Sequence, residues 1–276
     1  MKIALIQEKQ NELYRFHDED LSFHRDEMLF LQKEMVEQNL GLIRNAATRG
    51  VDLVLTSEAI NFPGQLRCMR GWTSAELVEE QQGWVLEELG KAACAANMYI
   101  VAGIYRVCDD GELRNQAVVF DRSGREIHSY TKNFLAGDER EYLTAGTDFP
   151  VWKSEFGPIG LGVCWDMQFP ETCRAYVKQG AEMVLAPTWG WEHPYACARA
   201  YENGIYVAAA MAVPQYKNIE GKRAPSMLVS PDGEVLAEGP CDRPAVVVAE
   251  IDCLGSCEPY RSLRMGCLSS WEHGYA

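Results

Sequence analysis

Short apolar segments of strand length alternate with helical stretches along most of this chain. Near-continuous apolar runs occur at 2–7 (KIALIQ), 98–107 (MYIVAGIYRV) and 182–189 (EMVLAPTW). A strand that is apolar throughout is buried on both faces, which is typical of sheets covered by helices. The stretch 73–96 begins with a Thr or Ser cap and continues with apolar residues at helical spacing. This alternation predicts an α/β protein whose sheets are covered.

Hairpins and further elements complete the predicted arrangement. One hairpin is expected at 115–130 around a Ser-Gly turn, and another at 226–239 on a Pro-Asp-Gly turn. The other expected elements are strands at 51–58, 159–166, 204–213 and 244–252, and helices at 27–48, at 170–181 and between the strands at 182–189 and 204–213. Because the sequence contains no linker, repeat or low-complexity segment, we expect a single domain. Its expected limits are 1–276, with a core at about 1–252 and a C-terminal tail at 253–276.

A polar, charged stretch at 8–30 separates the first strand from the first helix. We expect a solvated surface excursion there. A lid or a subunit contact is the alternative, since long loops in compact domains are often functional.

The net charge of the chain limits the kinds of molecule that it can bind. The formal net charge is −14, so nucleic acid and anionic membranes would both repel it. No run approaches 18 apolar residues, and the first strand is too short for a signal-peptide core. The sequence also lacks the glycine-rich phosphate-binding patterns of nucleotide enzymes. We therefore expect a cytoplasmic protein that binds a small molecule or another protein.

The chain has ten cysteines, but no pair has the CxxC spacing. In a reducing compartment most of them are expected to be small buried hydrophobes. A zinc site formed by Cys253, Cys257 and Cys267 is a less favoured alternative. We expect neither a metal nor a cofactor.

Three reactive residues occur at the ends of predicted strands. Glu58 ends the strand of LTSEAINFPG, Lys132 follows a strand in SYTKNFLAGDE, and Cys164 ends the strand of GLGVCWDMQFPE. Taken singly, these could be a solvated carboxylate, a surface lysine and a buried cysteine. Together they supply a base, a cation and a nucleophile, which attack on a carbonyl carbon requires. We expect the lysine and the following helix to lower the pKa of the thiol. No histidine is suitably placed to serve as the base.

In order, spacing and flanking residues, Glu58, Lys132 and Cys164 resemble the Glu-Lys-Cys signature of the carbon–nitrogen hydrolase (nitrilase) superfamily. The resemblance covers about residues 1–252. It implies a four-layer α-β-β-α sandwich and association into a homodimer or higher homo-oligomer. It also implies that Cys164 forms a thioester, that Glu58 acts as the base, and that Lys132 and the backbone N–H of Trp165 hold the oxyanion.

The resemblance further implies a second glutamate after the lysine. Glu139 fits the pattern Glu-x-x-Tyr-[Phe or Leu]-x-x-Gly together with Tyr142 and Gly146, whereas Glu141 fits a shorter spacing. We assign Glu139.

The residues after the nucleophile, Trp165 and Asp166, look like those of the amidase and N-carbamoylase branches. The implied reaction is hydrolysis of an amide or N-carbamoyl group of a small molecule, with water as the acyl acceptor and release of ammonia or an amine. Asn115, Asp166 and Glu171 are expected to be scaffold residues.

Aromatic and polar residues that follow the strand at 182–189 are candidates for substrate binding, since small-molecule sites often have aromatic walls with a few polar groups. These candidates are Trp189, Trp191, Glu192, His193 and Tyr195. Core packing of the two tryptophans and a solvated Glu192 is the alternative.

Three other functions stay open at this point. A true nitrilase would cleave nitriles rather than amides, and Asp166 argues against it. A non-catalytic or redox-sensing binding protein would have no need of the intact trio. Acyl transfer to a soluble amine would use the same residues with a different acceptor.

Overall fold

Two six-stranded sheets form the centre of the computed structural model, which describes residues 1–14, 22–64, 73–213, 223–251, 262–263 and 265–267. The strands of the first sheet are β1 (Lys2–Gln7), β2 (Leu53–Leu55), β3 (Tyr99–Val107), β4 (Leu113–Phe120), β5 (Glu126–Thr131) and β12 (Ala245–Glu250). Those of the second sheet are β6 (Trp152–Ser154), β7 (Gly157–Leu161), β8 (Met183–Thr188), β9 (Tyr206–Met211), β10 (Met227–Val229) and β11 (Val235–Glu238). The strand orders are β12-β1-β2-β3-β4-β5 and β11-β10-β9-β8-β7-β6.

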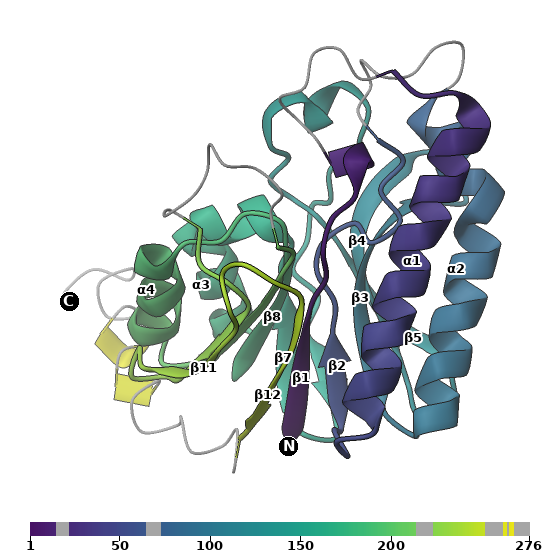
Figure 1. Ribbon diagram of the computed structural model, residues 1–276. Helices are drawn as coiled ribbons and strands as arrows, with labels where there is room; N and C mark the ends of the chain where they lie inside the picture. Colours follow the sequence, from purple (N-terminus) through teal and green to yellow (C-terminus); the bar gives the residue numbers. More distant parts are fainter. Residues whose placement is uncertain (15–21, 65–72, 214–222, 252–261, 264, 268–276) are drawn as a thin grey trace.

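Four helices cover the outer faces of the two sheets (Figure 1). They are α1 (Arg25–Ala47), α2 (Ser74–Ala96), α3 (Pro170–Lys178) and α4 (His193–Asn203). Helices α1 and α2 pack on the first sheet and share an apolar cluster with β1–β4, whereas α3 and α4 pack on the second sheet. The expected four-layer α-β-β-α sandwich is confirmed.

Helices α2 and α3 start where the sequence predicts because residues that favour helix starts mark their first turns. Thr73 caps α2 by accepting a hydrogen bond from the Glu76 backbone N–H, while the Glu76 side chain accepts one from the Thr73 N–H. Pro170 occupies the first turn of α3, where its missing N–H costs nothing. Helix α4 ends at Gly204, whose φ of 62° is a left-handed conformation that glycine adopts without strain.

The functional edge of the molecule follows from strand direction. Strands β1, β2 and β3 run parallel, as do β7, β8 and β9. Two antiparallel pairings, β3 with β4 and β4 with β5, bring β5 back into the direction of β3. The carboxyl ends of β2, β5, β7 and β8 therefore lie at the same edge, where ligands bind in sheets of this kind.

The structure differs from the sequence prediction at the end of one strand, in one additional strand and in the polar stretch 8–30. Strand β7 stops at Leu161 because Cys164–Gln168 forms a 3-10 turn, and β6 is an edge strand that the sequence did not indicate. In the polar stretch 8–30, Glu12–Tyr14 forms a 3-10 helix in which Tyr14 is buried. The prediction of a solvated stretch is therefore wrong for this turn, because the Tyr14 side chain packs in an apolar cluster. Residues 15–21 lie outside the described part, as do Cys253 and Cys257 of the alternative zinc site.

Candidate active site

Cys164 lies at the first position of the 3-10 turn that follows β7, with a φ of 45°. A left-handed backbone is uncommon for a residue with a side chain, and such strain clusters at functional sites. Two glycines let the strand pass closely between its neighbours. A Cβ at Gly160 would lie 2.5 Å from the Tyr176 ring, and one at Gly162 would lie 2.9 Å from Met167 Sδ. Tight packing of β7 thus fixes where the turn delivers the sulfur.

Glu58 comes from the other sheet, three residues after the end of β2. It is followed by Ala59, which has a φ of 53°. The Glu58 backbone N–H donates to the Thr188 carbonyl oxygen of β8 at 3.5 Å, which links the two sheets. A Cβ at Gly103 would lie 2.8 Å from Glu58 Cα, so β3 can pass this backbone closely because it has glycine there.

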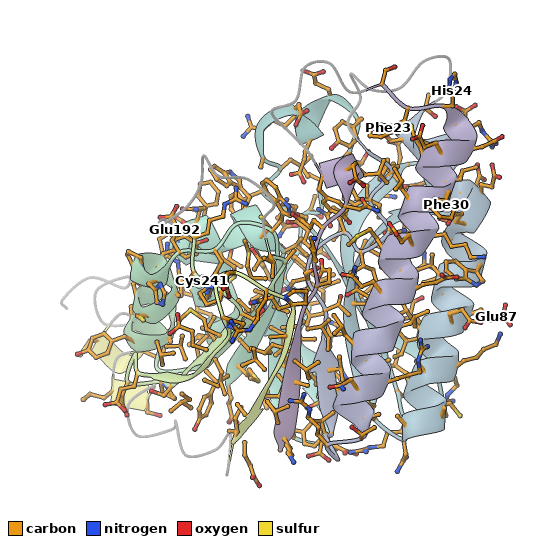
Figure 2. All side chains as sticks on the ribbon, viewed as in Figure 1. Phe23, His24, Phe30, Glu87, Glu192 and Cys241 are labelled. Carbon is orange, nitrogen blue, oxygen red and sulfur yellow. The ribbon has the colours of Figure 1, made fainter. Side chains whose placement is uncertain are left out.

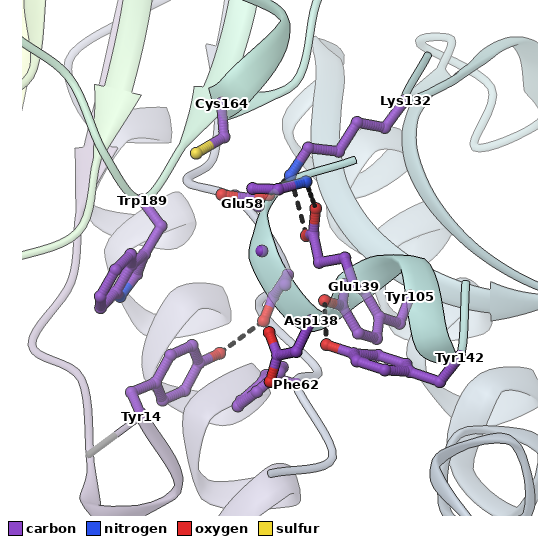
Figure 3. Close-up of a pocket in the computed structure, with 13 residues that line it drawn as sticks. Tyr14, Glu58, Phe62, Tyr105, Lys132, Asp138, Glu139, Tyr142, Cys164 and Trp189 are labelled. Atoms are coloured by element: carbon purple, nitrogen blue, oxygen red, sulfur yellow. Dashed lines mark hydrogen bonds and ion pairs between the residues drawn. The ribbon is translucent and has the colours of Figure 1, made fainter. Parts of the chain in front are cut away.

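Lys132 joins the two carboxylates of the site (Figure 3). Its Nζ lies 2.8 Å from Glu58 Oε1 and 2.8 Å from Glu139 Oε1, and all three side chains are buried. Asn115 Nδ2 donates to Glu58 Oε1 at 2.8 Å and fixes this carboxylate from β4. The structure therefore places Glu139 in the cluster, whereas Glu141 is exposed.

Burial and charge set the protonation of this cluster. Burial alone lowers the pKa of Lys132, but the negative charges of Glu58 and Glu139 raise it well above its usual value, so the amine is a cation. Burial and the charge of Glu58 raise the pKa of Glu139, although Lys132 opposes this shift. An ammonium ion has three N–H donors. Two of them are directed at the carboxylates, and among the described residues no acceptor takes the third, which leaves it for a bound oxyanion.

The expectation of a lowered thiol pKa is wrong. Burial of Cys164, together with the charge of Glu58 and a hydrogen bond to it, raises the thiol pKa to about 12. The Lys132 charge opposes this shift but is outweighed, since it is already paired with carboxylates. At neutral pH the sulfur carries its proton, so attack on a carbonyl needs a base that removes the proton during the reaction.

A cavity of about 170 Å³ opens beside the trio. Aromatic side chains form much of its wall: Tyr14, Phe62, Tyr105, Tyr142 and Trp189. Tyr14 donates a hydrogen bond to the Ala59 carbonyl, and so braces the turn after Glu58. Sequence reasoning missed Tyr14 and Tyr105 as wall residues, because the first lies in a polar stretch and the second in a strand that reads as core. The Asn-Phe-Pro-Gly turn after Glu58 was the available signal for Phe62.

The five sequence candidates for substrate binding are placed differently from one another. Trp189 lines the cavity. Trp191 is fully buried and packs edge-on against Tyr195, whose hydroxyl donates to the Gly190 carbonyl. Glu192 is exposed at the start of α4 (Figure 2), and His193 Nε2 lies 2.7 Å from Glu238 Oε1. As substrate contacts, these four stay predictions, and none of them lines the cavity.

A model of the family described as "Carbon-nitrogen hydrolase" matches residues 2–261. The chain belongs to the carbon–nitrogen hydrolase family. The resemblance inferred from the sequence is thereby confirmed.

Known members and solved structures agree with this assignment. Omega-amidase NIT2 of Xenopus tropicalis is 30% identical over 244 residues, which cover 81% of this chain and 86% of the relative. A carbon-nitrogen hydrolase of Helicobacter pylori has a TM-score of 0.76 at 21% identity, covering 95% of this chain and 92% of that one. A variant of an amidase from Nesterenkonia sp. has a TM-score of 0.69 at 25% identity, over 94% and 95% of the two chains. In that structure, the acetamide moiety of fluoroacetamide is bound covalently at the active-site cysteine.

Asp166 connects the two loops that carry Cys164 and Lys132 in this carbon–nitrogen hydrolase. Its Oδ2 accepts hydrogen bonds from the Val163 N–H at 2.8 Å and the Tyr130 hydroxyl at 2.9 Å. Its Oδ1 accepts from the N–H groups of Asn133 at 3.2 Å and Phe134 at 2.9 Å. Burial raises the pKa of Asp166 to about 6, although these hydrogen bonds oppose the shift. Asp166 thus holds the two loops together, which is the geometry expected of a scaffold residue.

Asp166→Asn is expected to lower kcat about 10-fold and the free energy of unfolding by about 2 kcal/mol. The amide keeps one acceptor oxygen, so a buried N–H loses its partner or faces another donor. Thermal unfolding and steady-state kinetics measure the two effects, with the exposed Asp242→Asn as the matched control. A variant that unfolds and turns over like the wild type would show that this acceptor set does not position the site.

No group of three or more His, Cys, Asp or Glu side chains in the described segments could hold a metal ion. In the same segments, no helix is both long and apolar enough to cross a membrane.

Proposed function

We propose that this carbon–nitrogen hydrolase cleaves the amide bond of a small molecule through a thioester on Cys164. One observation carries the proposal: a buried base, a buried cation and a thiol converge on one cavity from two different sheets. The amidases among its relatives and structural neighbours support an amide, rather than an N-carbamoyl group, as the bond that is cleaved.

In the first half of the reaction, Glu58 takes the thiol proton while Cys164 Sγ attacks the carbonyl carbon. The negative charge moves to the carbonyl oxygen, where the third N–H of Lys132 stabilises it. The backbone N–H of Trp165 is the proposed second donor, since the first N–H groups of a helical turn have no partner within the turn. Glu58 then gives its proton to the leaving nitrogen, and ammonia or an amine departs from the thioester.

In the second half, water takes the place of the released amine. Glu58 removes a proton from this water, which attacks the thioester carbon. The same donors stabilise the second oxyanion, and the proton held by Glu58 returns to Cys164 as the acid leaves. Glu139 has no proton to transfer in this scheme. It pairs with Lys132 and keeps the ammonium directed at the oxyanion.

A substrate panel tests the proposal. Wild-type protein is incubated with short linear amides, N-carbamoyl amino acids, N-carbamoyl amines and nitriles, and ammonia release is measured alongside intact-protein mass. We expect ammonia from amides and an acyl adduct on Cys164. Turnover of nitriles without turnover of the matched amides would instead identify a nitrilase, and neither ammonia nor an adduct across the panel would contradict catalysis of this kind.

We further propose a single domain that associates into a homo-oligomer in the cytoplasm. The family resemblance supports the association, and light scattering on the purified chain measures it. The seven cysteines in the described part of the chain are free thiols, which suits a reducing compartment. Imaging of a tagged chain tests the location.

A further inference from the structure

Glu8 is a buried carboxyl that the proposed reaction does not use. It directly follows β1, at the start of the polar stretch 8–30, yet it is fully buried. Its carbonyl oxygen accepts a hydrogen bond from the Val213 N–H at 2.8 Å, which links the end of β1 in the first sheet to the residues after β9 in the second. Its Oε1 accepts a hydrogen bond from the Ser57 hydroxyl. The carboxyl is thereby joined to the residue directly before Glu58.

The segment that carries Glu58 lies beyond the end of β2 and is held by side chains from elsewhere. Its backbone turns at Ala59, which has a φ of 53°. Glu8 holds the residue before Glu58, since it accepts the hydrogen bond of the Ser57 hydroxyl. Tyr14 holds the residue after it, through a hydrogen bond to the Ala59 carbonyl oxygen (Figure 3). The chain segment after β1 therefore fixes this turn on both sides of the proposed base.

The burial of the Glu8 carboxyl is poorly compensated. Its second oxygen, Oε2, has no hydrogen-bond partner among the described residues. Burial raises the pKa of Glu8 to about 7, although the hydrogen bond from Ser57 opposes the shift. A buried polar atom without a partner costs free energy, whereas an apolar side chain of similar size would pack without that cost. A carboxyl that adds little to the stability of the fold points to a use at the neighbouring site.

We propose that Glu8 is a positioning residue, which holds Ser57 and thereby directs the Glu58 carboxylate at the sulfur of Cys164. The inference rests on the proposed function, because it takes Glu58 as the group that removes the thiol proton. A base must lie within about 3 Å of the proton that it takes, so a displacement of about 1 Å costs much of the rate. Glu8 does not line the cavity, so it acts through the segment that carries the base.

Two variants that break this hydrogen bond test the proposal. Glu8→Leu removes the acceptor, and Ser57→Ala removes the donor. We expect each to lower kcat for amide hydrolysis about 30-fold and to change KM less than about 2-fold, because the displaced group is a base and not a substrate contact. Glu8→Gln keeps an acceptor oxygen for the Ser57 hydroxyl, so its kcat should stay within about 3-fold of the wild type.

Ser230→Ala is the matched control for Ser57→Ala. Ser230 is also buried, and its hydroxyl oxygen accepts hydrogen bonds from the N–H groups of Asp232 and Glu234 in the turn between β10 and β11. Its loss should keep the wild-type kcat, because this turn does not carry a group of the site.

Double variants show whether Glu8 acts through Ser57 and Glu58. Glu8→Leu combined with Ser57→Ala should be about as slow as either single variant, since both break the same hydrogen bond. In Glu58→Gln, assayed at about pH 9, adding Glu8→Leu should cause no further loss, because the base that Glu8 positions is already gone.

Three outcomes would overturn the proposal. A wild-type kcat in Glu8→Leu would show that the hydrogen bond does not matter to the reaction. An undiminished loss from Glu8→Leu in the Glu58→Gln background would show that Glu8 does not act through the base. A Glu8→Gln variant as slow as Glu8→Leu would show that the charge of the carboxyl is needed, and not its bond to Ser57.

A second measurement does not depend on turnover. The charge of Glu58 and its hydrogen bond raise the pKa of the Cys164 thiol, so the ionisation of this thiol reports where Glu58 lies. Iodoacetamide is added at about pH 9, and mass spectrometry of the proteolytic peptide that contains Cys164 follows its alkylation. We expect Glu8→Leu and Ser57→Ala to raise the alkylation rate about 3-fold, because a displaced Glu58 raises the thiol pKa less. Glu8→Gln should leave the rate unchanged.

The two measurements separate this inference from the proposed function. If the wild type hydrolyses no amide, the proposed function fails. Faster alkylation of Cys164 in Glu8→Leu and Ser57→Ala would then still show that Glu8 positions Glu58, and an unchanged rate would overturn that inference as well.

Discussion

Cys164→Ala is expected to lower kcat/KM for amide hydrolysis about 10⁵-fold while the fold survives. The thioester cannot form without the sulfur, and loss of a nucleophile that acts as part of a unit removes most of the rate enhancement. Alanine fits the space of the thiol, since it is smaller than cysteine and Cys164 is buried. Ammonia release and thermal unfolding measure the two quantities.

Cys173 provides a matched control, because it is also buried and its pKa is also raised to about 12 by burial. It lies in α3, the helix that follows the 3-10 turn Cys164–Gln168. Cys173→Ala is expected to keep turnover, with a lower unfolding temperature from the cavity it leaves. Full activity of Cys164→Ala on a good substrate would remove the thioester route.

Glu58→Gln is expected to lower kcat about 10³-fold at neutral pH and to give the enzyme a new pH dependence. The amide cannot take a proton, so the variant depends on thiol that has already ionised. Burial, the largest cause of the raised pKa of Cys164, stays in this variant, although the charge of Glu58 no longer adds to it. Wherever the pH lies below the pKa of the thiol, the ionised fraction rises about tenfold for each pH unit. The activity of Glu58→Gln should therefore rise steeply between about pH 7 and pH 9, and the wild type should show no such slope over this range. Measurement of kcat/KM across that range tests this directly.

Glu139→Gln is the natural comparison, since Glu139 is the other carboxylate bonded to Lys132. Glu139→Gln should slow the reaction because it weakens the ion pair that positions the Lys132 ammonium. The activity of this variant should not rise steeply with pH. A flat pH profile for Glu58→Gln, or the same slope in both variants, would contradict the assignment of Glu58 as the base.

The trio could be predicted from sequence because Glu58, Lys132 and Cys164 each follow a strand. Parallel topology then brings strand ends to one edge, so position along the chain translates into proximity. The pKa of the thiol could not be predicted in this way. The sequence indicates that a lysine is near, but not that the sulfur is buried and that two carboxylates already use the lysine charge.

The walls of the cavity were harder to predict than its reactive groups. Tyr14 enters the wall from a segment whose composition suggests solvent exposure. Arg223 is far along the chain from the trio, and the hydrogen bonds of Arg223 and Ala224 to the loop after β8 bring it near the site. In the same loop, Trp189 and Trp191 are two residues apart but face different surroundings, since one lines the cavity and the other is fully buried.

The division of the reactive groups between the two sheets has a consequence for how this enzyme loses activity. Glu58 and Lys132 follow strands of the first sheet, and Cys164 follows a strand of the second. Their alignment depends on an apolar interlayer that contributes little to secondary structure itself. A slight slippage of one layer against the other would separate the base from the sulfur while both sheets keep their hydrogen bonds. At moderate temperature or low denaturant concentration, activity should therefore be lost before the far-UV circular dichroism signal. Catalytic activity is then a more sensitive measure of the packing between the two sheets than secondary structure is.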